Sequence, residues 1–509
     1  MGWLIRGFGS LLAPTAKRFY KTLSQPQATQ QTLQNALFQQ LMQSKYGKSL
    51  GIKSVDDWHK IPIVTYGDLQ PWIEDNNSLN TDPVLFYEKT SGSSGPAKQI
   101  PYTRALRKSF NTLFCVWAHD LIVNGPGFET GNVYMCISPK LLAPGETPAG
   151  LQDDSEYLDL WLRWLLKPFL VSPPDAHKPQ TPEVFQANLC KTLLLAENLE
   201  TISIWSPSFL KVQLDYIHIH RVALRSQLTH QLSPARSHLL SQETINWEAL
   251  WPKLKLISCW DSVLAADQVS ALQNHFPHTL IQGKGLLATE APMTVPLLGA
   301  NGCVPMLTEV FFEFEDEAGA IHLLHELELG HTYSVIISQK GGLYRYRMGD
   351  RIQPTHYYQS TPCLRFLGRS HSTSDMVGEK LTLTFVSQIL TQLETQLDLP
   401  DNAFKCLVPC LSPQPHYSLF IDHISRCETH TAQVLDQLLC QSFHYRQARL
   451  LGQLQPARIY ASSDIPQRLM HYHYQHGKRL GDVKYPHLLT TAIQTAETLL
   501  SNPHYSPLR

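Results

Sequence analysis

Apolar positions in the first 300 residues repeat at the spacing of helices and of short buried strands. Residues 28–48 place leucines four residues apart, which predicts a helix that Gly47 is expected to end. Residues 61–74 predict a short extended piece and then a helix that begins at Thr65. Short apolar runs with the length of buried strands lie at 133–138, 201–205 and 254–259. Strands that alternate with helices predict an α/β fold.

The pattern of apolar and polar positions changes after Val304. Apolar runs that predict a meander of strands lie at 310–314, 320–324 and 333–338. The meander ends in GLYRYRMGDR at 342–351, where the alternation predicts a strand and Gly349 a turn that aims Asp350 outward. A segment of mixed strand and helix character follows FLGR at 366–369. We expect a large N-terminal domain over residues 1–368, with mixed sheets, a β-barrel-like part and flanking helices, and a smaller mobile α+β domain over 369–509.

Composition and charge narrow the class of partner. A chain of 509 residues is too long for one core. Its 42 basic and 43 acidic side chains create no overall field that would attract nucleic acid or an anionic membrane. No run approaches the roughly 20 apolar residues of a membrane span. The apolar, basic N-terminus lacks the features of a signal peptide and is expected to form an amphipathic helix on the body of the protein.

The ten cysteines show no CxxC pair, so we expect buried free thiols in a reducing cytoplasm. The spacing of Cys406 and Cys410 leaves a metal site open as the alternative. The partner should be a small molecule, and the protein is expected to be a monomer.

The segment FYEKTSGSSGPAKQIPYT at 86–103 is the most informative motif. It places a run of small and hydroxylated residues before Lys98, and that run comprises Thr90, Ser91, Gly92, Ser93, Ser94 and Gly95. Such residues let backbone N–H groups converge on an anion, and the lysine adds a charge, so the segment suits the phosphates of a nucleotide. The alternative is a flexible surface loop.

Two other segments resemble nucleotide-binding motifs but do not fit them. The GKS at 47–49 lacks the first glycine of a P-loop, because Met42 stands in that position. Gly283, Gly285 and Ala288 fit a dinucleotide fingerprint only nominally, since they lie in mid-chain without a clear βαβ unit.

Three later residues have chemistry that suits a nucleotide, and each has a plainer alternative. Glu290, next to Thr289, could bind a hard cation that bridges phosphate oxygens, or it could be a solvated charge on a turn. Asp350 could accept hydrogen bonds from a ribose diol, or it could pair with a neighbouring arginine. Lys484 taken alone would be a solvated charge.

In this order the motifs resemble those of the adenylate-forming enzymes, and most closely the auxin-responsive promoter (Gretchen Hagen type) family of acyl-acid amido synthetases. The resemblance covers nearly the whole chain. It rests on the segments TSGSSGPAKQIPYT at 90–103, IWSPSFL at 204–210, LKLISCWD at 254–261, ATE at 288–290, YRMGD at 346–350, FLGRSHSTSDMVGEKL at 366–381 and GDVKYP at 481–486. The chain departs from the family at Leu286 and Leu287, where an aromatic residue that stacks on adenine is frequent.

The resemblance implies a reaction in two steps. A carboxylate attacks the α-phosphate of MgATP to give an acyl-adenylate and pyrophosphate, and an amine, typically of an amino acid, then takes the acyl group and releases AMP. The implied roles are phosphate binding by the loop at 90–95 and Lys98, Mg²⁺ binding by Glu290, and ribose binding by Asp350. Arg369 would act at the hinge of the C-terminal domain, and Lys484 would stabilise charge between the carboxylate and the α-phosphate.

Two rival functions stay open. An acyl-CoA synthetase or an ester-forming relative shares the first step, and a non-catalytic nucleotide-binding relative would keep only the fold. The sequence does not identify the acid substrate. The apolar residues that could line its pocket, or could equally belong to the core, are Phe114, Trp117, Trp161 and Trp205.

Overall fold

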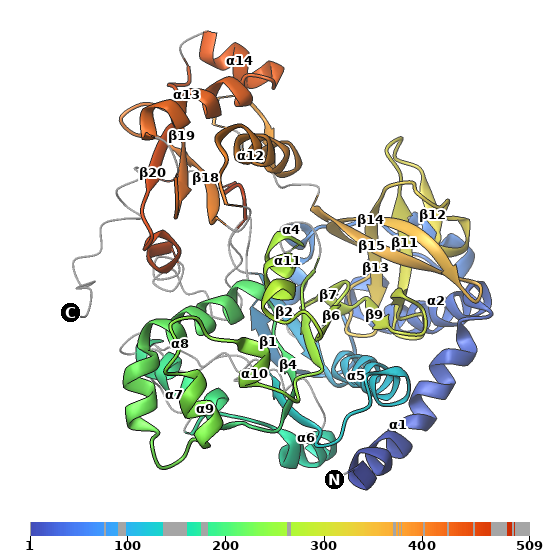
Figure 1. Cartoon of the computed structure of the whole chain (residues 1–509). Helices are drawn as coiled ribbons and strands as arrows, with labels where there is room; N and C mark the ends of the chain where they lie inside the picture. Colours follow the sequence, from blue (N-terminus) through green and yellow to red (C-terminus); the bar gives the residue numbers. More distant parts are fainter. Residues whose placement is uncertain are drawn as a thin grey trace. The chain divides into compact units, whose positions relative to one another are not determined.

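The computed structural model divides the chain into two compact units, each described by itself (Figure 1). The structure describes residues 2–75, 78–89, 98–135, 160–174, 182–261, 266–369, 373–374, 376–377, 379–400, 403–424, 427–450, 453–469, 486–490 and 493. The first unit comprises Met1–Thr90, Ala97–Ala265 and Leu272–Arg369, and the second comprises Ser91–Pro96, Ala266–Ala271 and Ser370–Arg509. That residues 369–509 form a mobile domain stays a prediction.

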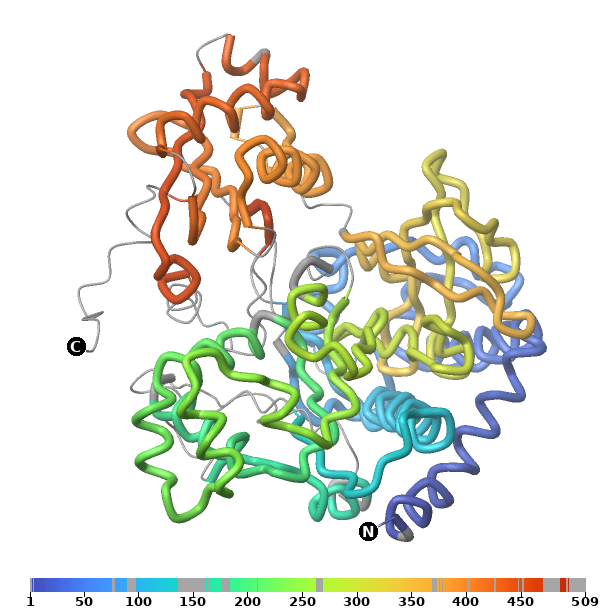
Figure 2. Tube along the Cα trace, viewed as in Figure 1, coloured from blue at the N-terminus to red at the C-terminus, as the bar shows by residue number. Residues whose placement is uncertain are grey.

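The N-terminal residues form the amphipathic helix that the sequence predicts. Helix α1 (Gly2–Thr22) buries Leu12, Ala16 and Phe19 on one face. Helix α1 contacts helix α5 (Arg104–Asn124), and the two are the dark blue and cyan segments of Figure 2. Burial of these side chains holds α1 on the first unit.

The next helix is confirmed, but the role predicted for Gly47 is wrong. Helix α2 (Pro26–Gln43) ends four residues earlier, and the Ser44 hydroxyl accepts a hydrogen bond from the Gly47 N–H at 2.9 Å to begin the short helix α3 (Lys45–Ser49). Gly47 is needed because a Cβ there would lie 1.9 Å from the Leu41 carbonyl oxygen. It therefore permits a close approach of two helices and does not terminate one.

A capping box begins the helix that leads to the nucleotide motif, as predicted. The Thr65 backbone N–H donates to the Asp68 carboxylate at 2.8 Å, and helix α4 (Tyr66–Glu74) follows. The short helix before it is η1 (Val55–Lys60). The Thr65 cap satisfies N–H groups that the first helical turn leaves without partners.

A parallel sheet confirms the α/β prediction for the middle of the chain. Its strands follow the order β3 (Asn132–Met135), β4 (Leu199–Ser203), β5 (Leu256–Cys259) and β6 (Leu280–Gly283). The last part of the predicted run at 133–138 lies outside the described residues. The helices of this region are α6 (Leu160–Leu166), η3 (Lys167–Phe169), α7 (Pro182–Leu195), α8 (Pro207–Gln227), α9 (Pro234–Leu239), α10 (Trp247–Leu250) and α11 (Ala266–His275).

The predicted meander is an antiparallel sheet. Its order is β12 (Ile321–Leu323), β11 (Val310–Glu315), β13 (Tyr333–Gln339), β14 (Tyr346–Tyr358) and β15 (Thr361–Arg369), with η5 (Leu324–Glu326) after β12. Paired short strands precede it, namely β7 (Leu287–Ala288) with β8 (Ala291–Pro292) and β9 (Thr294–Leu297) with β10 (Gly302–Pro305). The apolar face of this sheet packs on α2 and the helices that follow it in one core.

The second unit has the α+β character that the sequence predicts. Strand β18 (Lys405–Cys410) pairs antiparallel with β19 (His416–Ile421), and β19 pairs parallel with β20 (Arg458–Ala461). The remaining elements are β16 (Thr373–Ser374), β17 (Leu381–Thr382), α12 (Leu383–Leu397), α13 (Glu428–Leu439) and α14 (Phe443–Leu450). Burial raises the pKa of the Cys406 thiol to about 12, so Cys406, one of the two cysteines whose spacing left a metal site open, is a neutral core side chain.

Within the described ranges, no helix combines the length and the apolar character that a membrane crossing requires.

Candidate functional site

A hairpin carries the Ser/Gly motif. Strand β1 (Val84–Lys89) pairs antiparallel with β2 (Gln99–Thr103), and the last register pair is Lys89 with Gln99. Residues 90–97 connect these paired ends, and the predicted phosphate-binding residues Thr90, Ser91, Gly92, Ser93, Ser94 and Gly95 lie outside the described residues. The structure therefore locates the two ends of the motif.

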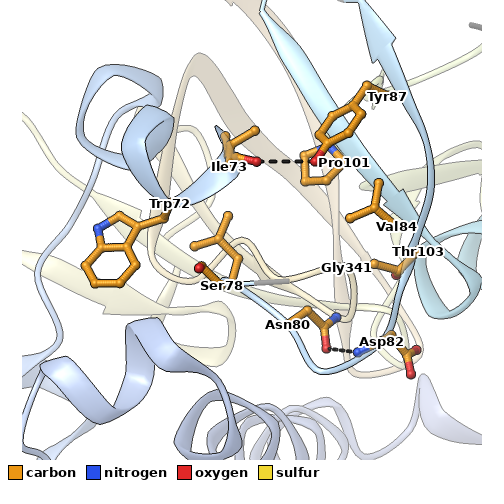
Figure 3. Close-up of a pocket in the computed structure, with 11 residues that line it drawn as sticks. Trp72, Ile73, Ser78, Asn80, Asp82, Val84, Tyr87, Pro101, Thr103 and Gly341 are labelled. Carbon is orange, nitrogen blue, oxygen red and sulfur yellow. Dashed lines mark hydrogen bonds between the residues drawn. The ribbon is translucent and has the colours of Figure 1, made fainter. Parts of the chain in front are cut away.

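The open end of this hairpin is fastened to its surroundings at a small pocket (Figure 3). The Tyr87 hydroxyl donates to the Ile73 carbonyl of α4 at 3.2 Å. The Asp82 N–H donates to Asn80 Oδ1 at 3.1 Å, and the Asn80 amide donates to the Lys340 carbonyl at 2.9 Å. These bonds connect the hairpin to α4 and to the turn between β13 and β14.

Lys98 lies next to the third predicted motif. Its Nζ donates to the Tyr346 hydroxyl at 3.0 Å and lies over the rings of Tyr66 and Tyr346, at 5.9 and 5.6 Å from their centres. The Tyr66 hydroxyl also accepts a hydrogen bond from the Gln99 N–H at 2.9 Å. The two tyrosines thus orient the lysine at the point where the Ser/Gly segment rejoins β2.

The second predicted motif is a tight turn between β7 and β8. Thr289 and Glu290 form the turn, and the Glu290 side chain is buried although it carries a carboxylate. The Tyr102 hydroxyl of β2 donates to the Thr289 carbonyl at 2.8 Å, and the Gln339 amide of β13 donates to the Glu290 carbonyl at 3.1 Å. Hydrogen bonds therefore join this turn to the hairpin on one side and to the large antiparallel sheet on the other.

The prediction for Gly349 and Asp350 is wrong in detail. Strand β14 continues through both residues, and Asp350 is buried, with 3% of its surface exposed. Gly349 has φ +78°, and the register between β13 and β14 shifts at this position, so the glycine allows a bulge. The sequence pattern could not distinguish a bulge within a strand from a turn after it, since glycine favours both.

The arginines around Asp350 pair with glutamates of β11 and of the turn that follows it. Arg345 contacts Glu313 at 2.8 Å, Arg347 contacts Glu315 at 2.7 Å, and Arg351 contacts Glu317 at 3.3 Å. The alternative pairing of Asp350 with a neighbouring arginine stays a prediction, because these three ion pairs involve other carboxylates. Asp350 itself stands opposite Arg369 in the register of β14 and β15.

Among these three arginines, Arg345 is held by several contacts. It is a non-glycine residue with φ +45°, and its guanidinium donates to both Glu313 oxygens and to the carbonyls of His59 and Ile61. The Trp58 indole N–H donates to the same carboxylate at 3.2 Å. This buried group fixes the chain immediately before Tyr346, which contacts Lys98.

The side chains of the two remaining predicted residues lie outside the part of the chain that the structure describes. Arg369 ends strand β15, and only its backbone belongs to the described structure. Lys484 lies outside the described residues.

A polar cluster at the carboxyl ends of the parallel strands was missed by the sequence analysis. The Lys284 Nζ donates to the Ser203 hydroxyl at 2.8 Å and lies 5.2 and 5.9 Å from the ring centres of Trp205 and Trp117. The Trp117 indole N–H donates to Gln282 Oε1 at 2.9 Å. A usable signal was present, because serine and glutamine end apolar strand runs and Lys284 lies between the two glycines of the rejected dinucleotide pattern.

Cys259, at this edge of the sheet, is a buried thiol. Burial raises the pKa of the Cys259 thiol to about 12, with the positive charge of Lys284 acting in the opposite direction. A neutral thiol is a poor nucleophile, so the structure offers no support for an acyl-cysteine intermediate here. The part of the chain that the structure describes also holds no cluster of three or more His, Cys, Asp or Glu side chains that could bind a metal ion.

Comparisons with protein families match three consecutive stretches. The N-terminal domain model of the GH3 family matches residues 15–281, its central domain model 303–369 and its C-terminal domain model 384–493. The first match alone covers more than half of the 509 residues.

Individual relatives are distant in sequence and similar in length. A protein of Arabidopsis thaliana named probable indole-3-acetic acid-amido synthetase GH3.1 is 21% identical over 88% of this chain and 86% of its own. A mouse protein named only as GH3 domain-containing is 26% identical over 42% of this chain and 43% of its own. The solved acyl acid amido synthetase AtGH3.15 in complex with 2,4-DB has a TM-score of 0.80 and 17% identity, over 97% of this chain and 96% of that one. At this identity the structural likeness shows a shared fold.

Proposed function

The chain belongs to the GH3 family, and we propose on that premise that it is an ATP-dependent acyl-acid amido synthetase. It adenylates a carboxylic acid with release of pyrophosphate. It then transfers the acyl group to an amine, the amino group of an amino acid, with release of AMP. The relatives named as amido synthetases support both the acid and the amine half of this reaction.

One observation in this chain carries the proposal. The segments that resemble the nucleotide motifs are far apart in sequence, yet hydrogen bonds connect them in space. Lys98 contacts Tyr346, Tyr102 of the same hairpin contacts Thr289, and Gln339 contacts Glu290. A chain with an unrelated fold is not expected to bring these particular segments into contact.

The described residues suit the roles assigned to them. Lys98, oriented by two tyrosines, supplies a positive charge where the Ser/Gly segment rejoins β2, which suits phosphate oxygens. Glu290 supplies one buried carboxylate with Thr289 beside it, and Mg²⁺ commonly takes one or two protein carboxylates together with substrate phosphates. Asp350 supplies the carboxylate for the ribose hydroxyls. When bound, Mg²⁺ would neutralise phosphate charge.

The other roles rest on the family resemblance. The loop of Thr90, Ser91, Gly92, Ser93, Ser94 and Gly95 holds phosphates. Arg369 sets the orientation of a C-terminal domain that begins at residue 369, and Lys484 of that domain stabilises charge between the carboxylate and the α-phosphate. We also propose that the enzyme is a monomer and that it works in the cytoplasm. The free thiols of its described cysteines support the second point, because they favour a reducing compartment.

The first test is carboxylate-dependent exchange of radioactive pyrophosphate into ATP, measured over a broad panel of acids with Mg²⁺ present and with Mg²⁺ removed by a chelator. We expect exchange that requires both an acid and Mg²⁺. Absence of exchange with every acid, from protein that circular dichroism shows to be folded, would favour the non-catalytic relative.

The second test identifies the acceptor. Each acid that supports exchange is incubated with ATP and with amino acids, coenzyme A or alcohols, and the products are identified by mass spectrometry. We expect an amide and stoichiometric AMP. Formation of a thioester or an ester alone would replace the amide reading by the corresponding rival.

A further inference from the structure

The parallel sheet changes from apolar to polar on one face at its carboxyl edge. Parallel strands pair residues in register, so partners in successive strands lie in a row on the same face. The last such row comprises Met135, Ser203, Ser258 and Gln282, and the row two residues earlier comprises Val133, Thr201, Leu256 and Leu280. Strands buried on both faces are ordinarily apolar throughout, so a polar last row at the edge where α/β sheets bind ligands indicates a binding site.

The row contains a buried hydroxyl without a partner, and a cation contacts the row. Lys284 donates to Ser203 and lies over two indole rings. The Ser258 hydroxyl is fully buried and makes no hydrogen bond within the described part of the chain. A buried hydroxyl without a partner destabilises the fold, and a ligand oxygen at this position would supply the missing partner. The row therefore suits an anion with two acceptor oxygens, such as a carboxylate.

An apolar chamber begins beside the same row. It is partly open, and its empty space together with the solvent-open part amounts to about 660 Å³. Its walls come from α1, α5, β3, β4 and the segment around η3, and they include Ile5, Phe8, Trp117, Ala118, Gly131 and Met135. Met135 ends strand β3 in the polar row, and Trp117 contacts both Gln282 and Lys284, so the chamber and the polar row adjoin.

The chamber is long, and the described part of its lining carries no charge. The lining runs from Gly131, directly before β3, to Met135 at the end of β3, which is at most about 13 Å at roughly 3.3 Å per residue and matches an extended acyl chain of roughly ten carbons. Among the described residues of the lining none is charged, so a second carboxylate or an amine at the far end of a ligand would find no partner among them. Helix α1 contributes Ile5 and Phe8 to the far end.

From these two features we infer that the acid substrate is a flexible aliphatic monocarboxylic acid of about ten carbons. The carboxylate of this acid binds Lys284 and the serines of the polar row, and its hydrocarbon chain fills the chamber beneath α1. This inference rests on the proposed function and adds to it the class of acid. Lys284 is then a substrate-binding residue, and Ala118 on α5 helps to set the length of chain that the chamber accepts.

The first experiment measures binding, independently of catalysis. Decanoic acid and 1-decanol are titrated into the full-length protein without ATP, and binding is followed by calorimetry. We expect the acid to bind roughly 10- to 100-fold more tightly than the alcohol, because a hydrogen bond to a charged group is worth roughly 1.5–3 kcal/mol. Lys284→Met should remove this preference while leaving the alcohol affinity nearly unchanged, and Lys284→Arg should restore part of it.

The second experiment measures chain length. Pyrophosphate exchange is compared for butanoic, decanoic and indole-3-acetic acid in the wild type, in Ala118→Phe and in Val123→Phe. The Ala118→Phe side chain fills the chamber, so the ratio of kcat/KM for decanoic over butanoic acid should fall at least tenfold. Val123 lies on the same helix with 61% of its surface exposed, so Val123→Phe should leave the ratio unchanged.

The outcomes separate this inference from the proposed function. Exchange with indole-3-acetic acid, together with neither binding nor exchange of decanoic acid, would overturn the inference and leave the amido synthetase standing. Lys284-dependent binding of decanoic acid without exchange by any acid would support the acid site and overturn the proposed function. An unchanged chain-length ratio in Ala118→Phe would exclude the chamber as the site of the chain, even if Lys284→Met fails to fold.

Discussion

At the scale of single residues, Arg345 shows how a buried ion pair can hold a site together. Its side chain is 5% exposed, as is that of Glu313, and its left-handed backbone conformation directs the guanidinium to that carboxylate and to two carbonyls. Tyr346 follows it directly and orients Lys98. The strained conformation is thus placed next to a residue of the candidate site.

We predict that Arg345→Met lowers the free energy of unfolding of the first unit by roughly 3–5 kcal/mol, because it leaves the Glu313 carboxylate buried without its charge partner. Methionine keeps the left-handed backbone at the same strain, so the change reports the ion pair. The measurement is urea denaturation followed by tryptophan fluorescence.

The control is Arg351→Met, which removes a pair whose Glu317 side chain is 82% exposed and should cost less than about 1 kcal/mol. The double variant Arg345→Met with Glu313→Leu should regain most of the loss, since it removes both buried charges. Equal effects of the Arg345 and Arg351 variants would contradict the role given to the buried pair.

At the scale of elements, a carboxylate joins strand β4 to the turn that leads into β3. Glu200 is fully buried and accepts hydrogen bonds from the backbone N–H groups of Glu129, Thr130 and Gly131 at 2.7–3.1 Å. The Lys255 ammonium lies 3.2 Å from the same carboxylate. These contacts fix the turn that carries Gly131, one wall of the apolar chamber.

This arrangement predicts a pH-dependent stability. Burial raises the pKa of Glu200, but the three N–H groups and Lys255 outweigh it and hold the pKa below its ordinary value. A depressed folded-state pKa contributes stability that is present above the unfolded pKa of about 4.3 and is lost as the pH falls through the folded value. Glu200→Gln should therefore cost about 3 kcal/mol near pH 7.

The difference in stability between Glu200→Gln and the wild type should narrow as the pH is lowered below about 4, because the wild-type carboxylate then becomes protonated and loses its charge. Thermal denaturation between pH 3 and 7.5 measures it. Glu248→Gln is the matched control, since the Glu248 carboxylate accepts a single backbone hydrogen bond, from the His278 N–H at 2.7 Å. A difference that stays constant over this range would show that the carboxylate charge is not the stabilising feature.

The elements also show what the sequence could and could not reveal. Runs with strand or helix spacing became elements because local period and burial agreed, as at Thr65, where a capping box marks the start of α4. Gly47 and Gly349 were misread, because a glycine marks a need for space or for a left-handed φ and does not say which element meets that need.

The candidate site could be predicted from the sequence only in part, for a related reason. Lys98, Thr289, Glu290 and Asp350 stand in motifs whose order carries information. The partners that orient them, such as Tyr66, Tyr102 and Gln339, are set by contacts between distant segments. The polar row with Lys284 escaped notice because it exists only when four strands are placed in register.

At the scale of the whole molecule, the proposed catalytic residues divide between the two units. Lys98, Glu290 and Asp350 belong to the first unit, and Lys484 belongs to the second. The proposed reaction has two transition states, with phosphate chemistry in the first and amine attack on an acyl carbon in the second. A C-terminal domain that changes its orientation between the steps would let Lys484 serve the first alone.

We therefore predict that Lys484→Ala lowers acid-dependent pyrophosphate exchange roughly 100- to 1,000-fold, the size expected when one group that stabilises developing charge is removed. The same variant, supplied with chemically prepared acyl-adenylate and an amino acid, should form amide within about threefold of the wild-type rate, because the lysine acts on the α-phosphate step. Lys53→Ala, at an exposed lysine of the first unit, is the matched control and should change neither half-reaction. Equal losses in both half-reactions would mean that Lys484 supports the fold or both steps together, and the division of labour between the two units would then have to be abandoned.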